Sequence, residues 1–171
     1  EKLTMIELRN YPSVSQAITT IPKGRLIIKI SKDLQKYIIE LGKEGTLLKT
    51  RLKEIIQDVD KETDLIIKDY THLDLKKSKI LLESLSYDEL LDKENILKVL
   101  AYEKPMKINI VKGWRILSKT SLEEKDIASI IRESGSLGKA IHSNIAFHSK
   151  VLGEEKASLF KDEIERIKLN F

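Results

Sequence analysis

The segment SGSLGKAIHS, residues 134–143, contains the glycine and lysine residues that bind phosphate in many nucleotide-binding proteins. A phosphate-binding loop needs four residues between its first glycine and its Gly-Lys pair, and it follows a strand. Here only two residues separate Gly135 from Gly138 and Lys139, and no strand pattern precedes them. The segment is therefore predicted to be a turn followed by the start of a helix.

The histidine and serine residues do not form a convincing metal or catalytic pattern. His142 and His148 are six residues apart, a poor spacing for one face of a helix, and His72 is remote in the sequence. Ser143 beside His142 is not a triad, because nucleophile, base and orienting group are recognised by geometry. The chain also has no cysteine, which excludes disulfides, thiolate metal ligands and cysteine nucleophiles.

An apolar stripe between residues 27 and 70 indicates the element that must hold the rest of the chain in place. Its members recur at steps of three and four residues, averaging about 3.5, which is typical of a helix with a narrow seam facing another helix. Charged residues between them supply the solvated face. We expect a spine helix, or two helices broken near Gly42 and Gly45, used for packing. The stripe consists of Ile27, Ile30, Leu34, Tyr37, Leu41, Leu48, Leu52, Ile55, Val59, Ile66 and Tyr70.

A short helix is expected before the spine. Ser13 and Gln16 have the spacing of a capping box, which marks the start of a helix. The pattern predicts that this helix stops at Ile21, because Pro22 and Gly24 disfavour its continuation.

Further short helices follow the spine. The segment KKSKILLESL, residues 76–85, is amphipathic, and Ser86 with Glu89 forms a second capping-box pattern. Asp92 or Lys93 begins another short helix. We expect these pieces to fold back on the spine.

Pro105 marks the expected boundary between two domains, because its ring restricts Lys104 and ends the preceding helix. The predicted domains are a helical spine domain, residues 1–105, and a second domain, residues 106–171. The INIV run, residues 108–111, is interpreted as a short strand or as a linker packed on a core.

The second domain is predicted to consist of short helices joined by tight turns that contain glycine. This pattern favours an all-α chain whose second part is a helix-hairpin-helix type of module. The four helical segments are GWRILSK, KDIASIIRES, GKAIHSN and EEKASLFKDEIERIKL.

Composition sets only loose limits on function. The net charge is +4, and residues 106–171 hold 12 Lys and Arg against 9 Asp and Glu, a balance of +3 that supports nucleic-acid binding weakly. No apolar run approaches the roughly 18 to 20 residues that span a bilayer, so no membrane contact is expected. No secretory leader is visible, and the start at Glu1 without a methionine suggests a fragment or a processed chain.

Over nearly its whole length the chain resembles the C-terminal part of the DisA family, DNA integrity scanning proteins with diadenylate cyclase activity. Each matching string is an ordinary helical sequence, and their common order and spacing carry the resemblance. In that family an N-terminal cyclase domain precedes a helical linker that forms a spine, and a helix-hairpin-helix domain follows. Residues 1–105 match the linker and residues 106–171 the terminal domain. The strings are YIIELGKEGTLL, LIIKDY, SYDELLD, KVLAY, KGWRILSK and KASLFKDEIERI.

The resemblance implies an activity that this chain should lack. The Asp-Gly-Ala and Arg-His-Arg motifs of the cyclase domain do not occur in the sequence, so no catalytic residue is assigned. The parent protein would join two ATP molecules into cyclic di-AMP with a divalent metal, Mg²⁺ or Mn²⁺, whereas this chain is expected to need no cofactor. Further implied features are homo-oligomers assembled through the spine and cyclase domains, the ATPase RadA as a partner, and a cytoplasmic, nucleoid-associated location.

The expected DNA-binding turn lies at residues 151–157. In helix-hairpin-helix modules, glycine amides of the turn, the positive end of the next helix and nearby Lys or Arg contact phosphate without reading bases. The usual turn is Gly-hydrophobe-Gly, and here Leu152, Gly153 and Lys156 match the apolar, second glycine and basic positions, while Val151 replaces the first glycine. In the other alignment Gly153 is the first glycine and Glu155 replaces the second. The turn is predicted either to bind phosphate or to be purely structural.

A second, weaker turn is expected at residues 120–124, where Lys119, Lys125 and Arg132 could contact phosphate among three acidic residues. The leading hypothesis is sequence-independent binding of duplex or branched DNA on behalf of an attached cyclase. The alternative is a structural or oligomerisation module whose degenerate turn does not bind DNA.

Overall fold

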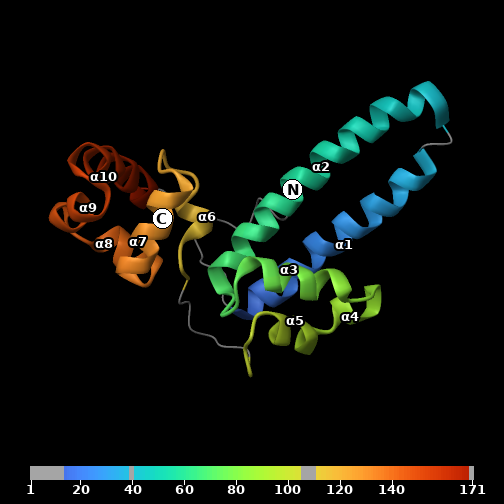
Figure 1. The fold of residues 1–171 in the computed structure, drawn as a ribbon, viewed down its shortest axis with the longest axis horizontal. Coiled ribbons are helices and arrows are strands. Elements are labelled where there is room, and N and C mark those ends of the chain that lie inside the picture. Colours follow the sequence, from blue (N-terminus) through green and yellow to red (C-terminus); the bar gives the residue numbers. More distant parts are fainter. Residues whose placement is uncertain (1–13, 39–40, 105–110, 170–171) are drawn as a thin grey trace.

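A computed structural model describes residues 14–38, 41–104 and 111–169 of the 171-residue chain. Within these ranges the chain forms ten helices and no strand, which confirms the all-α prediction (Figure 1). A two-helix arm projects from one side of the molecule, and a bundle of short helices lies at the other end (Figure 1).

The arm is an antiparallel pair of long helices, α1 (Val14–Ile38) and α2 (Gly42–Tyr70) (Figure 1). The chain reverses at Gly42, which has a positive φ of 61°, so the predicted break near this glycine is confirmed. A single unbroken spine helix is thereby excluded.

The predicted helix stop at Ile21 is wrong, because α1 continues through Pro22 and Gly24. Proline removes one backbone donor and strains one turn. Ile18, Ile21 and Ile28 are buried, so packing on both sides of Pro22 compensates that loss. The capping-box residue Ser13 lies outside the described residues.

Gly24 allows the two arm helices to approach closely. A methyl group at this position would collide with Oγ1 of Thr63 on α2. Thr63 is fully buried, and its hydroxyl donates to the carbonyl of Val59 at 2.6 Å, so the side chain is held in place. The glycine is therefore a contact point between helices rather than a helix breaker.

Three short helices pack against the base of the arm: α3 (Leu75–Ser84), α4 (Tyr87–Leu91) and α5 (Lys93–Val99). The capping box of α4 is confirmed, with Ser86 and Glu89 exchanging side-chain and backbone hydrogen bonds. Asp92 caps α5, as expected from its position before Lys93. The core shared by α1–α5 includes Ala17, Ile18, Ile21, Ile66, Ile67, Tyr70, Leu82, Leu90, Ile96 and Leu100.

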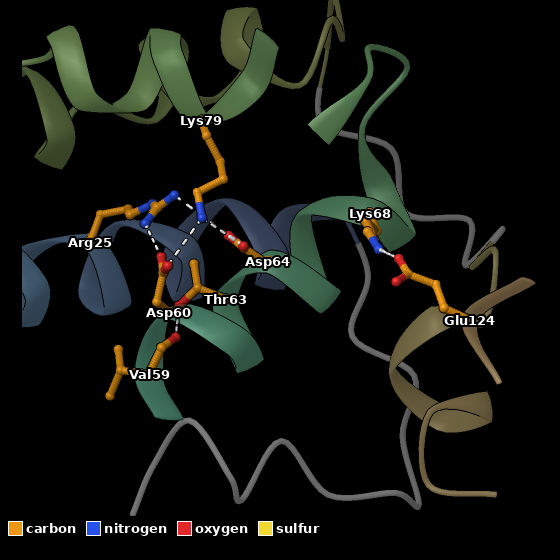
Figure 2. A network of polar contacts seen from close by, with 8 residues as sticks. All are labelled: Arg25, Val59, Asp60, Thr63, Asp64, Lys68, Lys79 and Glu124. Atoms are coloured by element: carbon orange, nitrogen blue, oxygen red, sulfur yellow. Dashed lines mark hydrogen bonds and ion pairs between the residues drawn. The ribbon is translucent and has the colours of Figure 1, made fainter. Parts of the chain in front are cut away.

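A polar network fastens α3 to the arm. Figure 2 shows Arg25 of α1 and Lys79 of α3 reaching the same two carboxylates of α2, Asp60 and Asp64. Arg25 lies 2.6 Å from Asp60, and Lys79 lies 2.6 Å from Asp64 and 3.1 Å from Asp60. Burial acts to raise the pKa of Asp60, but Lys79 and Arg25 outweigh it and hold the pKa below its usual value.

The remaining helices form the terminal bundle, α6–α10. They are α6 (Trp114–Leu117), α7 (Glu124–Ser134), α8 (Leu137–His142), α9 (Ile145–Leu152) and α10 (Glu154–Leu169). Four of them were expected, whereas α9 was missed; Asn144, whose side chain caps it, was the available signal. The core of the terminal bundle includes Ile116, Leu117, Ile127, Ile130, Leu137, Ala140, Phe160 and Ile164.

The predicted domain boundary at Pro105 and residues 108–110 of the INIV run lie outside the described residues. The division at Pro105 therefore stays a prediction. Val111, the last residue of the run, is buried with the core of α1–α5.

The joint between the arm and the terminal bundle is built on Asp69, near the end of α2. This carboxylate is only 3% exposed, and it accepts backbone N–H bonds from Gly113 (2.9 Å), Trp114 (2.6 Å) and Arg115 (3.3 Å). It thus supplies the cap that Gly113, which precedes α6, cannot provide itself. Nζ of Lys112 also donates to the carbonyl of Thr71 at 2.6 Å.

Lys68 adds a second contact to the joint. Its Nζ lies 2.5 Å from a carboxylate oxygen of Glu124 and 4.5 Å from the centre of the Trp114 ring. Figure 2 shows this bridge between α2 and the first turn of α7. Two neighbouring residues of α2 therefore hold α6 and α7 in position.

Burial raises the pKa of Asp69 to about 6, although the three backbone N–H groups and Arg115 favour its charged form. The folded value exceeds the ordinary value of 3.8, so the folded protein binds this proton more tightly than the unfolded chain. Stability from this group is complete below about pH 4 and falls as pH rises to about 6, by about 3 kcal/mol. Lys112, Arg115 and Tyr70 are the other titratable groups that interact with it.

We predict that Asp69→Asn removes this pH dependence while keeping an oxygen acceptor for the amides. Between pH 4 and 6.5 the free energy of unfolding of the wild type should fall by about 2 kcal/mol relative to the variant, as measured by urea unfolding, because part of the change occurs below pH 4. Asp69→Ala should destabilise by about 1–3 kcal/mol, since it leaves buried donors unpaired. Parallel pH curves for wild type and Asp69→Asn, with Asp58→Asn as an exposed control, would contradict this account.

Candidate nucleic-acid interface

The predicted DNA-binding turn is a one-residue junction between α9 and α10, formed by Gly153. The Gly153 N–H donates to the carbonyl of Ser149 at 2.9 Å and closes α9, while its own carbonyl accepts from the Ala157 N–H at 3.0 Å and opens α10. Its φ of 84° and ψ of 159° belong to a region that only glycine occupies readily. A methyl group added at this site would meet no atom within 4 Å, so the requirement for glycine is conformational.

The start of α10 is suited to bind an anion. The N–H groups of its first three residues, Glu154, Glu155 and Lys156, precede the first intrahelical hydrogen bond, and Gly153 has no side chain that could cap them. Backbone amides and the helix dipole attract negative charge at such an end. The exposed carboxylates of Glu154 and Glu155 reduce this attraction without occupying the amides by any contact among the described residues.

The other helix starts of the terminal bundle already have an oxygen or acidic residues. Asp69 serves α6, Ser136 caps α8 and Asn144 caps α9. The first turn of α7 carries Glu124 and Asp126. By the same measure α10 carries Glu154 and Glu155, so α7 and α10 are the two helix starts of this bundle that no side-chain oxygen caps among the described residues. The start of α10 differs from that of α7 by its glycine junction, which brings no side chain over the amides.

Val151 and Leu152 are half-buried and pack against the core of the terminal bundle. Val151, which replaces the first glycine of the usual turn, thus contributes apolar contact in place of a flexible backbone. Leu152 occupies the apolar position as expected. The packing of these two side chains on the core holds the turn in place.

Lys156 points from the first turn of α10 to α7. Its Nζ lies 2.6 Å from Oδ2 of Asp126, and the lysine side chain is 42% exposed while that of Asp126 is 14% exposed. The hydrogen bond from Lys156 is the main cause that holds the pKa of Asp126 below its usual value. The structure thus brings the two predicted turns together, but through a lysine that already has a carboxylate partner.

The second predicted turn lies beside α10. Its Ser121 N–H donates to the carboxylate of Glu163 at 2.9 Å. Lys119 is exposed in this turn, whereas Lys125 is paired with Glu123 at 2.8 Å and Arg132 with Glu133 at 3.2 Å. Of these three cations, Lys119 is the one with no ion-pair partner among the described residues.

The roles of Asp69, Asp126 and Glu163 were missed from the sequence. Their partners are 30 to 46 residues away, and short-range spacing carries no signal for such contacts. Only their position near predicted helix ends could have marked them as candidates.

The segment SGSLGKAIHS forms a turn and a helix start, as predicted. Gly135 has a φ of 75° and ends α7, and the side chain of Ser136 caps α8. His148 is buried, with Nε2 lying 2.8 Å from the carbonyl of Ala140 and its ring edge-on to Phe160. It serves the core, and the described residues contain no group of three or more side chains that could hold a metal.

The described helices include none that is long and apolar enough to cross a membrane. Comparison with known families matches residues 1–109 to the DisA bacterial checkpoint controller linker region.

Curated relatives extend the similarity to most of the chain, and each is named DNA integrity scanning protein DisA. The protein of Fusobacterium nucleatum is 33% identical over 138 residues, covering 77% of this chain and 40% of the relative. That of Clostridium botulinum (strain Alaska E43) is 28% identical and covers 97% and 49%. That of Bacillus subtilis is 28% identical and covers 96% and 48%. The chain spans about half the length, or less, of these relatives.

We predict that Gly153→Ala destabilises the protein by about 1–3 kcal/mol, because alanine must adopt a backbone region that it disfavours. Gly138→Ala is the matched control: Gly138 lies inside α8, has open space around it, and should gain about 0.5–1 kcal/mol from the better helix propensity of alanine. Urea unfolding of both variants measures the difference. Equal stabilities would show that the turn tolerates other conformations.

Proposed function

The chain belongs to the DisA family through its linker region, and we propose that it is the connecting and DNA-binding half of a longer DisA-like protein. The linker match and the relatives confirm the resemblance inferred from the sequence. Two parts of the molecule support functions more specific than family membership: the terminal bundle supports DNA binding, and the arm supports assembly.

DNA binding is supported chiefly by the open start of α10 at Gly153. A phosphate there would accept hydrogen bonds from backbone amides and charge from Lys156, and Lys119 offers a further exposed cation. Contacts of this kind read the backbone and not the bases, so binding would be independent of sequence. The name of the relatives, DNA integrity scanning protein, agrees with such a role.

We assign the chemistry of the parent protein to its other half. That half would join two ATP molecules into cyclic di-AMP with Mg²⁺ or Mn²⁺, because this chain matches neither motif of the cyclase domain. RadA as a partner and a cytoplasmic, nucleoid-associated location belong to the same proposal. In this proposal, the chain connects the cyclase half of the parent protein to the DNA-binding bundle.

Fluorescence anisotropy with duplex and branched DNA tests the proposal. The affinity should fall steeply with salt, and Lys156→Glu with Lys119→Glu should weaken binding and reduce the salt slope by about 0.9 for each lost phosphate contact. Lys49→Glu with Lys53→Glu, two exposed lysines of α2, is a control of equal charge change. Absence of salt-sensitive binding at low ionic strength, or equal losses in both double variants, would refute it.

A second candidate function is assembly, which is favoured by an unpartnered apolar face of the arm. The predicted seam is only partly buried: Ile66 and Tyr70 lie in the core, but most of its other residues remain exposed. Exposed fractions range from 39% to 68% for Ile27, Ile30, Leu34, Tyr37, Leu41, Leu48 and Ile55. The helix packing expected for this seam is therefore not found within the described chain at these positions.

These residues lie on one side of the arm. On α1 they precede by one residue the positions that face α2, such as Ile28 and Ser31; on α2, Ile55 precedes the half-buried Ile56 in the same way. One residue rotates a helix by about 100°, and because the helices are antiparallel, both stripes turn to the same side. The opposite side is covered by α3 through the Arg25–Asp60–Lys79 network (Figure 2).

We assign this face to a second copy of the chain. A 3-4 apolar spacing is typical of helices that pack on other helices, and two arms together would form a four-helix bundle. Arg51 and Asp58 are exposed on the same face of α2, one on each side of Ile55. A two-fold axis near Ile55 would bring Arg51 of each copy close to Asp58 of the other.

Sedimentation velocity tests this assignment. The wild type should associate with increasing concentration, and Ile30→Lys with Ile55→Lys should be monomeric, because lysine ammonium groups cannot be buried in an apolar seam at low cost. Ile80→Lys on α3 is the control, since Ile80 is exposed to a similar extent, 57% against 49% for Ile30 and Ile55, but belongs to α3 and not to the arm. A wild type that stays monomeric at its highest soluble concentration would exclude the assignment.

A further inference from the structure

The first turn of α7 and the residue before it carry three carboxylates, each of which holds a lysine. Glu124 holds Lys68 of the joint, and Glu123 holds the neighbouring Lys125. Asp126 holds Lys156 from the first turn of α10. Only the last of these pairs involves a lysine at the proposed phosphate-binding turn.

We propose that Asp126 is an internal competitor of DNA phosphate, and that its bridge to Lys156 sets the affinity of the α9–α10 turn. This inference rests on the proposed function and names the residue that regulates the same site. The Asp126 carboxylate accepts a short, charge-assisted hydrogen bond of 2.6 Å from Lys156, and a phosphate oxygen of DNA would accept from the same ammonium group.

The geometry favours exchange of this lysine between the two anions. The Asp126 carboxylate is mostly buried, and α7 favours its charge because it lies in the positive first turn of that helix. The Lys156 side chain is more exposed than that of Asp126 and has a flexible stem, so its ammonium group can leave while the carboxylate stays. DNA must therefore replace the bridge before it gains the lysine.

Two consequences follow for binding. The free energy of the broken bridge is subtracted from the affinity, and a partly exposed ion pair of this kind is worth up to about a fivefold change in the binding constant. The Asp126 carboxylate also remains near the bound phosphate, where it repels the DNA. Both effects disappear when the carboxylate is replaced by a neutral group of the same shape.

The test compares Asp126→Asn with Asp162→Asn in DNA-binding titrations over a range of salt. Asp162 is exposed on α10, so its replacement changes the net charge of the same bundle equally without breaking the bridge. Asp126→Asn should bind duplex DNA about fivefold tighter than wild type, with a larger gain than Asp162→Asn and a salt slope steeper by up to about 0.9. Asp126→Ser, which keeps a residue that tolerates a first helical turn, should reproduce the gain.

A double-variant cycle with Lys156→Gln separates the bridge from the general charge of the bundle. The gain from Asp126→Asn should shrink in the Lys156→Gln background, where only the repulsion of phosphate by the carboxylate is left to remove, whereas that from Asp162→Asn should persist unchanged. If the wild type binds DNA and the two aspartate variants gain equally, the role of Asp126 is overturned while the proposed function stands. Binding that appears only in Asp126→Asn would support it, and no binding in any variant would overturn both it and the proposed function.

Discussion

The capping of α6 by Asp69 is the contact on which the arrangement of the two halves depends. The carboxylate belongs to the last turn of α2, and the amides that it accepts from belong to residues 113–115. A buried charge is costly unless it is well hydrogen-bonded, and three donors offset part of that cost here. Lys68 and Lys112 add bonds on either side, so the arm ends and the bundle begins in one rigid set of polar contacts.

Carboxylates also join elements elsewhere in the chain, where they receive a lysine or arginine from a different helix. Asp60 and Asp64 bind Arg25 and Lys79 to join three helices, and Asp126 joins α7 to α10. At least eight of the 31 lysine and arginine side chains form ion pairs with carboxylates within the chain. Each pair takes one positive and one negative charge, so the net charge of +4 is unchanged, but fewer lysine and arginine side chains remain unpaired.

Local signals predicted most elements of the fold, because caps and turns depend on neighbouring residues. The box of Ser86 and Glu89, the break at Gly42 and the turn at Gly135 are of this kind. Pro22 misled the prediction because burial of Ile18 and Ile28 outweighs a lost backbone bond. The turn at Gly153 was located from its residues, but the Asp126 bridge could not be, since only the folded chain brings residues 126 and 156 together.

One helix reaches from the tip of the arm to the joint, and this gives the molecule a mechanical property. The 29 residues of α2 extend for about 43 Å without interruption, at 1.5 Å for each residue. Its far end carries Leu47 and Leu48, and its near end carries Asp69. Because Asp69 fixes the near end of this helix to the start of α6, a force applied at the tip of the arm would act on the terminal bundle through a lever of this length.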